Sequence, residues 1–330
     1  MCSNIKKKYR LYRNYFRDYK ESNKYQVRCF NTLIYDMNTY LSRKHTPNHW
    51  LYRFIVDRVG IHKYTKKKLS IFGANGYREA ITLNKDKFKL FYTAENIHDE
   101  GSWWTQYEDL LIQEQSVSLS LGFDYITNPQ YLRFPFWMMV HFDPEDNYEI
   151  IKQKCQALSY HRDIDVKDKF CSFICRNDYN GDRKFFYDLI NSIDKVDCPS
   201  TFMHNDENLL LKYNNDKRAY LKKYKFNLCP ENSNFEGLVT EKIFDAIYSG
   251  CIPIYWGAEN NPEPDILNSD AIIFLKKGDN SSVLNDIEYL YKNKNEFIRF
   301  TSQARLKAEA PEIIYNSFQQ LERKIIQIIS

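Results

Sequence analysis

The segment between residues 225 and 257 constrains the fold of this chain more than any other. Its parts are, in order, an apolar run, a polar stretch, a segment with apolar side chains at helical spacing, and a second apolar run: residues 225–229, 230–239, 240–249 and 251–256. Thr240 suits a helix N-cap and Gly250 suits a helix C-terminus. A strand, loop, helix and strand in this order predict a unit with parallel strands.

The same alternation of strand and helix patterns recurs in both halves of the chain. Further strands are predicted at residues 69–72, 88–93, 117–121, 170–175 and 271–275. Further helices are predicted after Pro135 and at residues 148–158, 183–193, 216–224, 283–309 and 311–329. These patterns predict two α/β domains with mainly parallel sheets, and a ligand at the carboxyl ends of the strands, in the cleft between the domains.

The 330 residues suffice for two such domains. We expect an N-terminal domain at residues 1–155, a C-terminal domain at 156–310, and a helix at 311–330 that packs back on the N-terminal domain. Residues 1–62 have no clear assignment within this scheme, and the stretch between residues 143 and 162 is interpreted as the link between the halves.

Charge and composition bear on whether the chain binds nucleic acid or a membrane. A net charge of +4 is too small to indicate nucleic-acid binding by the whole chain. The first 20 residues, however, interleave Lys and Arg with Tyr and Phe. This pattern indicates either an exposed basic helix or a surface that contacts anionic lipid or nucleic acid.

No apolar run approaches the roughly 18–20 residues that cross a bilayer, and the start, Met-Cys-Ser-Asn-Ile-Lys, has no apolar core like that of a signal peptide. We therefore expect a cytoplasmic or peripheral membrane location for the chain as given. The 8 cysteines do not have zinc-site spacing. Cys171 and Cys175 are expected on one face of a buried strand, which fits a reducing compartment.

The start of the helix at residue 240 is a candidate anion site. Unpaired amides and the helix dipole attract anions there, and Lys242 adds a mobile cation. A diphosphate would suit this position. The residue types fit an ordinary capped surface turn equally well, so the pattern alone leaves both interpretations open.

A resemblance favours the first interpretation. The run Phe-Asn-Leu-Cys-Pro-Glu-Asn-Ser at residues 226–233 is followed by Val-Thr-Glu-Lys-Ile at 239–243 and by Ala246, Gly250, Ile-Pro-Ile at 252–254 and Gly257. This spacing closely resembles the signature of the α-1,3/α-1,4-fucosyltransferase family. Three further segments resemble that family in the same order: residues 91–96, residues 131–135 and Arg183 with residues 186–188. The likeness covers residues 69–275.

The resemblance implies a GT-B fold, with two Rossmann-like domains facing a central cleft, and inverting transfer of L-fucose from GDP-fucose. It implies Glu95 as the general base and Arg183 and Lys242 as the cations that hold the diphosphate. Asn232 and Glu241 would contact the donor sugar or ribose. Glu95 could instead be a surface carboxylate, and Glu241 a partner of the helix dipole.

An inverting transfer requires one carboxylate base and positive charge at the leaving diphosphate, so the residues above suffice without a metal or cofactor. Stimulation by Mn²⁺ is left open. Asp163-Ile-Asp165 superficially matches a metal-binding motif of another transferase fold, but it lies away from the matched segments. Pro230 and Leu238 depart from the family, which usually has an aromatic at the first position and often a donor-contacting Tyr at the second.

The acceptor implied by the resemblance is an N-acetylglucosamine-containing glycan, with the linkage, α-1,3 or α-1,4, undecided. Three alternatives remain: a transferase of this fold that uses another GDP-sugar, an inactive member of the family, and a non-catalytic protein that binds membrane or nucleic acid through its basic N-terminus. For the enzyme, we expect peripheral membrane contact through this N-terminus and no nucleic-acid partner.

Overall fold

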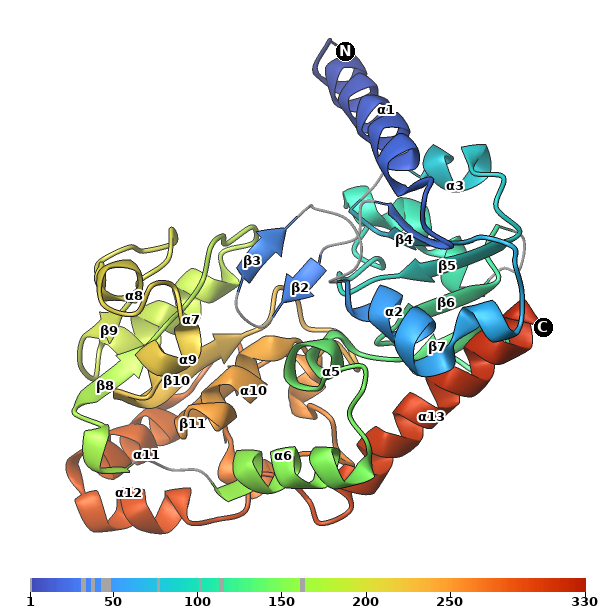
Figure 1. Cartoon of the computed structure of the whole chain (residues 1–330). Coiled ribbons are helices and arrows are strands. Elements are labelled where there is room, and N and C mark those ends of the chain that lie inside the picture. Colours follow the sequence, from blue (N-terminus) through green and yellow to red (C-terminus); the bar gives the residue numbers. More distant parts are fainter. Residues whose placement is uncertain are drawn as a thin grey trace. The chain divides into compact units, whose positions relative to one another are not determined.

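A computed structural model describes residues 2–30, 34–36, 39–42, 49–75, 78–100, 102–112, 116–160 and 164–330. The chain forms two compact units, one from residues 1–147 with 314–330 and the other from residues 148–313. Each unit contains its own five-stranded parallel sheet (Figure 1).

The sheet of the first unit has the strand order β1-β4-β5-β6-β7, and all its neighbours pair in parallel. Its strands are β1 (Val27–Phe30), β4 (Leu69–Gly73), β5 (Phe88–Tyr92), β6 (Leu119–Gly122) and β7 (Tyr131–Arg133). A separate antiparallel pair is formed by β2 (Ile34–Asp36) and β3 (Thr39–Ser42). The α-helices at residues 1–147 are α1 (Cys2–Ser22), α2 (Trp50–Arg53), α3 (Glu79–Leu83), α4 (Asp109–Ile112) and α5 (Phe136–His141).

Aromatic side chains build much of the first unit's core. Phe30 and Phe72, on paired strands, stack with ring centroids 5.2 Å apart. The last helix of the chain, α13 (Ala310–Ile329), contributes Phe318, whose ring lies 5.5 Å from that of Trp50 and 5.7 Å from that of Phe134. Burial of these rings fixes the C-terminal segment to the first unit.

The sheet of the second unit has the order β12-β11-β10-β8-β9, again all parallel. Its strands are β8 (Lys169–Ser172), β9 (Val196–Asp197), β10 (Tyr224–Pro230), β11 (Ile252–Trp256) and β12 (Ile273–Phe274). Its α-helices are α6 (Tyr148–Tyr160), α7 (Asp182–Asn191), α8 (Asn208–Leu211), α9 (Lys217–Leu221), α10 (Glu241–Tyr248), α11 (Ser281–Lys292) and α12 (Lys294–Thr301). Of these helices, α10 contacts both β10 and β11, the central strands of the sheet.

Several predicted elements need correction. Strand β1 was missed because it is short and carries the charged residue Arg28. The Nε atom of Arg28 forms an ion pair with Oδ2 of Asp86 at 3.4 Å. Strand β7 was interpreted as the lead into a helix. The strand predicted at 170–175 ends at Ser172, so Cys175 is buried but does not lie on it. The helix predicted at 283–309 is two helices, because the backbone becomes extended at Asn293.

The division between the units also differs from the expected boundaries at residues 155 and 310. Helix α6, interpreted as part of a linker, belongs to the second unit, where the Ser159 hydroxyl accepts hydrogen bonds from the amides of Arg305 at 3.1 Å and Leu306 at 3.3 Å. No helix within the described part of the chain is long and apolar enough to cross a membrane.

Candidate functional site

The predicted phosphate-binding residues of the second unit meet where β10 ends. Glu231 directly follows this strand and is completely buried. Its Oε1 accepts a hydrogen bond from the amide of Thr240 at 2.8 Å, and its Oε2 lies 2.7 Å from Nζ of Lys242. A buried carboxylate of this kind must be paired. Glu231 therefore joins the strand end to the start of α10.

Thr240 occupies the N-cap position of α10, as predicted, but its side chain does not cap the helix. The hydroxyl instead lies 2.8 Å from Oε2 of Glu231 and 2.8 Å from Nζ of Lys242. The expected side-chain cap was therefore wrong, because a buried carboxylate competes for the hydroxyl. Thr240 connects the acidic and the basic group of the site.

Lys242 is held at this site as an ammonium ion. Burial alone lowers the pKa of Lys242, but the negative charges of Glu231 and Glu241 outweigh burial and raise it above its ordinary value. The side chain keeps 20 % of its surface exposed. Lys242 can therefore present positive charge to an anion at neutral pH.

Arg183 reaches the same loop from α7. Its Nη2 donates to Oδ1 of Asn232, and its Nη1 donates to the carbonyl oxygen of Asn177 at 2.6 Å. The residue is 7 % exposed, and its buried Nε has no hydrogen-bond partner among the described residues. The carboxylate of Asp178 accepts from the amides at the start of α7, including that of Lys184 at 2.9 Å. Asn232 and Arg183, which are 49 residues apart, are thus brought together.

Glu241 is the first residue of α10, and its carboxylate lies 3.9 Å from Nζ of Lys217. Burial raises the pKa of Glu241, but the charges of Lys242 and Lys217 outweigh it, so that the pKa is lowered. Glu241 is thus ionised beside two lysines, a more specific environment than the helix dipole alone.

Gly257, which follows β11, is required by close packing against Glu231. Its backbone has φ 138°, and a Cβ at this position would lie 2.8 Å from both Cβ and Cγ of Glu231. Real Cβ atoms do not approach other carbons this closely, so any side chain here would displace Glu231. The sequence showed the glycine but not its partner.

A cavity of about 440 Å³ lies beside these groups, and residues adjacent in sequence to Arg183 and Asn232 line it. Its lining residues are Asn180, Asp182, Ser233, Asn234, Trp256, Glu259, Asn260, Lys276 and Lys277. The side chain of Asn234 holds one wall, since it donates to Oε1 of Glu259 at 2.9 Å and accepts from the Glu259 amide at 2.8 Å. Apart from Trp256, the residues that line the cavity are polar or charged.

Glu95 lies in the first unit, in the loop that follows β5. The Thr93 hydroxyl fixes its backbone, because it accepts from the Glu95 amide at 3.1 Å and lies 3.0 Å from the Glu95 carbonyl oxygen. The carboxyl ends of parallel strands carry the ligand-binding residues of such sheets. The structure thus places this predicted base in one unit and the predicted phosphate contacts in the other.

The two departures from the family signature are both buried. Leu238 is 3 % exposed, and Pro230 is the last residue of β10, opposite Trp256. Asp163 of the predicted Asp-Ile-Asp motif lies outside the described residues. Within the described ranges, no group of three or more His, Cys, Asp and Glu residues could hold a metal ion.

Glu231, which pairs with Thr240 and Lys242, was not among the site residues predicted from the sequence. The available signal was a glutamate placed between a buried strand and a helix N-terminus. Asn177 and Asp178, which position Arg183, were not identified either, since short polar residues are common in loops.

Two family models match most of the chain. The model described as glycosyltransferase family 10 (fucosyltransferase) C-term matches residues 164–318, and the model described as alpha-(1,3)-fucosyltransferase FucT N-terminal domain matches residues 34–140.

Curated relatives share shorter segments. Alpha-(1,3)-fucosyltransferase FucT of Helicobacter pylori is 37% identical over 139 residues, which are 40% of this chain and 27% of the relative. A putative fucosyltransferase-like protein of Arabidopsis thaliana is 35% identical over 107 residues, 32% of this chain and 20% of the relative. Alpha-(1,4)-fucosyltransferase of Arabidopsis thaliana is 44% identical over 57 residues, 17% of this chain and 14% of the relative. The matches thus span about a quarter or less of these relatives.

Solved structures match this chain over a larger share of its length. A crystal structure of alpha1,3-fucosyltransferase has a TM-score of 0.54 and 25% identity, and the match covers 80% of this chain and 79% of the other. A structure titled as the same enzyme with GDP-fucose has a TM-score of 0.50 and 25% identity, with 77% of each chain covered. With two parallel α/β units, these neighbours identify the GT-B type of fold that the resemblance implied. Together with the two family models, they show that the chain belongs to glycosyltransferase family 10, the fucosyltransferases.

Proposed function

We propose that this chain transfers L-fucose from GDP-fucose to a hydroxyl of an N-acetylglucosamine-containing glycan, with inversion at the anomeric carbon. One observation carries the proposal: a buried arginine, with an Nε that has no partner in the described structure, is held by Asn232 next to the Glu231–Lys242 pair. The relatives named for fucose transfer, and the neighbour crystallised with GDP-fucose, support the choice of donor.

The second unit supplies positive charge for the leaving diphosphate. Arg183 offers a planar guanidinium that can bind two phosphate oxygens, and Lys242 offers a point charge. As the bond from fucose to phosphate breaks, negative charge grows on the diphosphate, and fixed cations stabilise that charge more than the ground state. Asn232 and Glu241 are proposed to contact the donor sugar or ribose.

The first unit supplies the base. The Glu95 carboxylate is proposed to accept the proton of the acceptor hydroxyl while that oxygen attacks the anomeric carbon from the side opposite the diphosphate. This single displacement inverts the anomeric centre and needs one carboxylate. The GDP leaves already ionised and therefore requires no acid. The proposed reaction requires no metal.

The decisive experiment incubates the full chain with GDP-fucose and a panel of lactosamine-type acceptors, and detects product by mass spectrometry. Linkage analysis of the product distinguishes α-1,3 from α-1,4 transfer. Parallel reactions with GDP-mannose and UDP-sugars test the donor, and EDTA and Mn²⁺ test the metal. Absence of a fucosylated product on every acceptor would refute the proposed activity.

Replacing the base tests the mechanism. We expect Glu95→Gln to lower kcat by about 10²–10⁴-fold, the usual contribution of a general base, and to leave GDP affinity unchanged. Glu100→Gln, an exposed carboxylate five positions later, is the matched control and should retain activity. Equal rates for Glu95→Gln and the wild type would remove Glu95 from the mechanism. Calorimetry with GDP would show whether the donor site remains intact.

We also propose that α1 contacts an anionic membrane surface. Tyr15 packs on Phe30 with ring centroids 5.2 Å apart, while Tyr9 and Phe16 are 69 % and 58 % exposed on a helix rich in Lys and Arg. Exposed rings among basic residues suit the membrane interface. Sedimentation with vesicles containing phosphatidylserine tests this contact. Equally strong binding to uncharged vesicles would contradict it.

A further inference from the structure

We propose that His98 is a positioning residue, which holds the loop carrying Glu95 in place through an ion pair on each side of its ring. The proposal rests on the function proposed above, because it assigns the held loop a role in proton transfer. It adds a residue to which neither the sequence motifs nor the known signature gave a part.

The ring of His98 lies between two carboxylates. Its Nδ1 is 2.9 Å from Oε1 of Glu108, and its Nε2 is 2.6 Å from Oδ1 of Asp124. A neutral imidazole has a single N–H and could donate to only one of them, whereas an imidazolium donates to both. With both carboxylates ionised, only a positively charged ring satisfies both contacts, and the two contacts act as one clamp.

The clamp attaches the loop to two other elements. Asp124 follows the carboxyl end of β6, which neighbours β5 in the sheet, and its side chain is 5 % exposed. Glu108 precedes α4, and its side chain is 46 % exposed. Other groups at this position include the Phe123 ring, 6.4 Å from the His98 ring, and the Tyr131 hydroxyl, 3.5 Å from Oδ2 of Asp124.

Glu95 lies between two anchored points of the same loop. On one side, its amide is bound by the Thr93 hydroxyl at 3.1 Å. On the other side, the Asn96 side chain accepts from the His98 amide at 3.0 Å and donates to Asp99 at 2.8 Å. Thr93 fixes the entry of the loop and His98 fixes its exit, so loss of either contact would loosen the backbone that carries the base.

The charge on His98 makes this arrangement dependent on pH. The hydrogen bond to Asp124 raises the pKa of His98, burial opposes it, and Glu108 raises it further, to a pKa of about 9. The folded-state value is above the ordinary value of about 6.5. The clamp therefore stabilises the loop fully below about pH 6.5, and this contribution is lost as the pH rises through 9.

The first test measures the clamp without using activity. A histidine titration by NMR on the full chain should show one imidazole that titrates near pH 9, and this signal should be absent in His98→Gln. The same titration in Glu108→Gln, a half-exposed site where the fold is easily kept, should show a lower pKa. A His98 that titrates near 6.5 in the wild-type chain overturns the clamp.

The second test measures the consequence for catalysis. In Glu108→Gln and Asp124→Asn, we expect the fall of kcat at alkaline pH to begin at a lower pH than in the wild type. In His98→Gln, we expect kcat to be about 10–100-fold lower, with an unchanged KM for GDP-fucose. Glu100→Gln should keep the wild-type profile. An alkaline limb at the same pH in all these variants overturns the positioning role.

The two tests separate this inference from the proposed function. If the wild-type chain transfers no fucose while His98 still titrates near pH 9, the proposed activity fails and the positioning role fails with it, although the clamp itself exists. If fucose is transferred and the titration shows an ordinary histidine, the activity stands and only this inference fails.

Discussion

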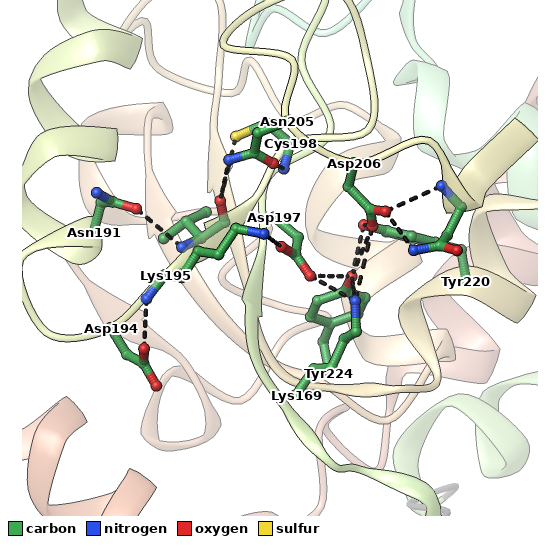
Figure 2. A network of polar contacts seen from close by, with 12 residues as sticks. Lys169, Asn191, Asp194, Lys195, Asp197, Cys198, Asn205, Asp206, Tyr220 and Tyr224 are labelled. Carbon is green, nitrogen blue, oxygen red and sulfur yellow. Dashed lines mark hydrogen bonds and ion pairs between the residues drawn. The ribbon is translucent and has the colours of Figure 1, made fainter.

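Strand β10 carries a polar cluster at each end, and the two clusters differ in how completely their charges are paired. At the amino end, Tyr224 begins the strand, and its hydroxyl lies 2.9 Å from Asp197 and 2.6 Å from the hydroxyl of Tyr220. Asp206 accepts from Tyr220 at 2.7 Å, and Lys169 lies 2.7 Å from Asp197 (Figure 2). We call these five residues the amino-end cluster.

The buried polar groups of the amino-end cluster are paired. Its acidic and phenolic side chains are all buried, and each of these polar groups has a partner within the cluster. Figure 2 also shows Lys195 on Asp197, so each carboxylate faces donors from more than one element. A fully bonded network of this kind makes the structure rigid and gives a ligand little to bind.

The cluster at the carboxyl end, formed by Glu231, Thr240, Lys242, Arg183 and Asn232, is incompletely paired. Glu231 forms an ion pair with Lys242, but the buried Nε of Arg183 has no partner in the described structure, although the Nη atoms are bonded. This difference agrees with the proposed function, in which one end of the strand serves stability and the other end binds the donor. Four substitutions test this division.

The largest effect is expected from Arg183→Ala. The loss of a fixed cation at the leaving group should lower kcat/KM for GDP-fucose by about 10²–10³-fold. Calorimetry should show weakened GDP binding as well. Arg176→Ala, in the loop after β8 and exposed, is the control. Undiminished GDP affinity in Arg183→Ala would contradict the binding role of this end.

Gly257→Ala should affect both stability and binding. The new Cβ would collide with Glu231, and the positive φ adds strain, so we expect a loss of about 1–3 kcal/mol in the free energy of unfolding together with weaker GDP binding. Gly278→Ala is a close control, since Gly278 has φ 108° and open space around it. Equal losses in urea unfolding of both variants would show that backbone strain, and not Glu231, explains the effect.

Tyr224→Phe should reduce stability alone. The variant removes the hydrogen bonds that the Tyr224 hydroxyl makes with the buried Asp197 and Tyr220, which costs about 1–2 kcal/mol. GDP affinity should not change. Tyr289→Phe, at a 54 % exposed site, is the control for urea unfolding. A loss of GDP binding in Tyr224→Phe would break the separation between the two ends.

The smallest effect is expected on the free energy of unfolding at acid pH. Burial raises the pKa of Asp197, but hydrogen bonds from Lys169, Lys195 and Tyr224 outweigh it and lower the pKa below its ordinary value. The ionised carboxylate therefore stabilises the fold above about pH 4, and this contribution is lost as the pH falls through the lowered pKa.

Asp197→Asn should accordingly flatten the dependence of unfolding free energy on pH below about 5, measured by urea titration at several pH values. Asp188→Asn, whose side chain is 54 % exposed beside Lys184, should retain the wild-type slope. If the slope in Asp197→Asn is as steep as that of the wild type, Asp197 does not contribute to the loss of stability at acid pH.

Much of the fold could be predicted from the sequence, because strand and helix patterns are local. The alternation of apolar runs with segments of helical spacing predicted that both sheets are parallel. It also located β10, α10 and β11 to within a residue or two. Two of the missed strands, β1 and β7, have only four and three residues. Such short runs carry too little periodicity, and only pairing with a neighbour defines them.

The sequence by itself determined which residue types stand near the end of β10 and at the start of α10, and the fixed spacing between them supported the family. Only the tertiary structure decided what these residues contact. It turned the Thr240 hydroxyl from the helix end to Glu231, paired Arg183 with Asn232, and set His98 between Glu108 and Asp124. The physical reason is that charge pairing acts through space, so it depends on which strand ends lie together.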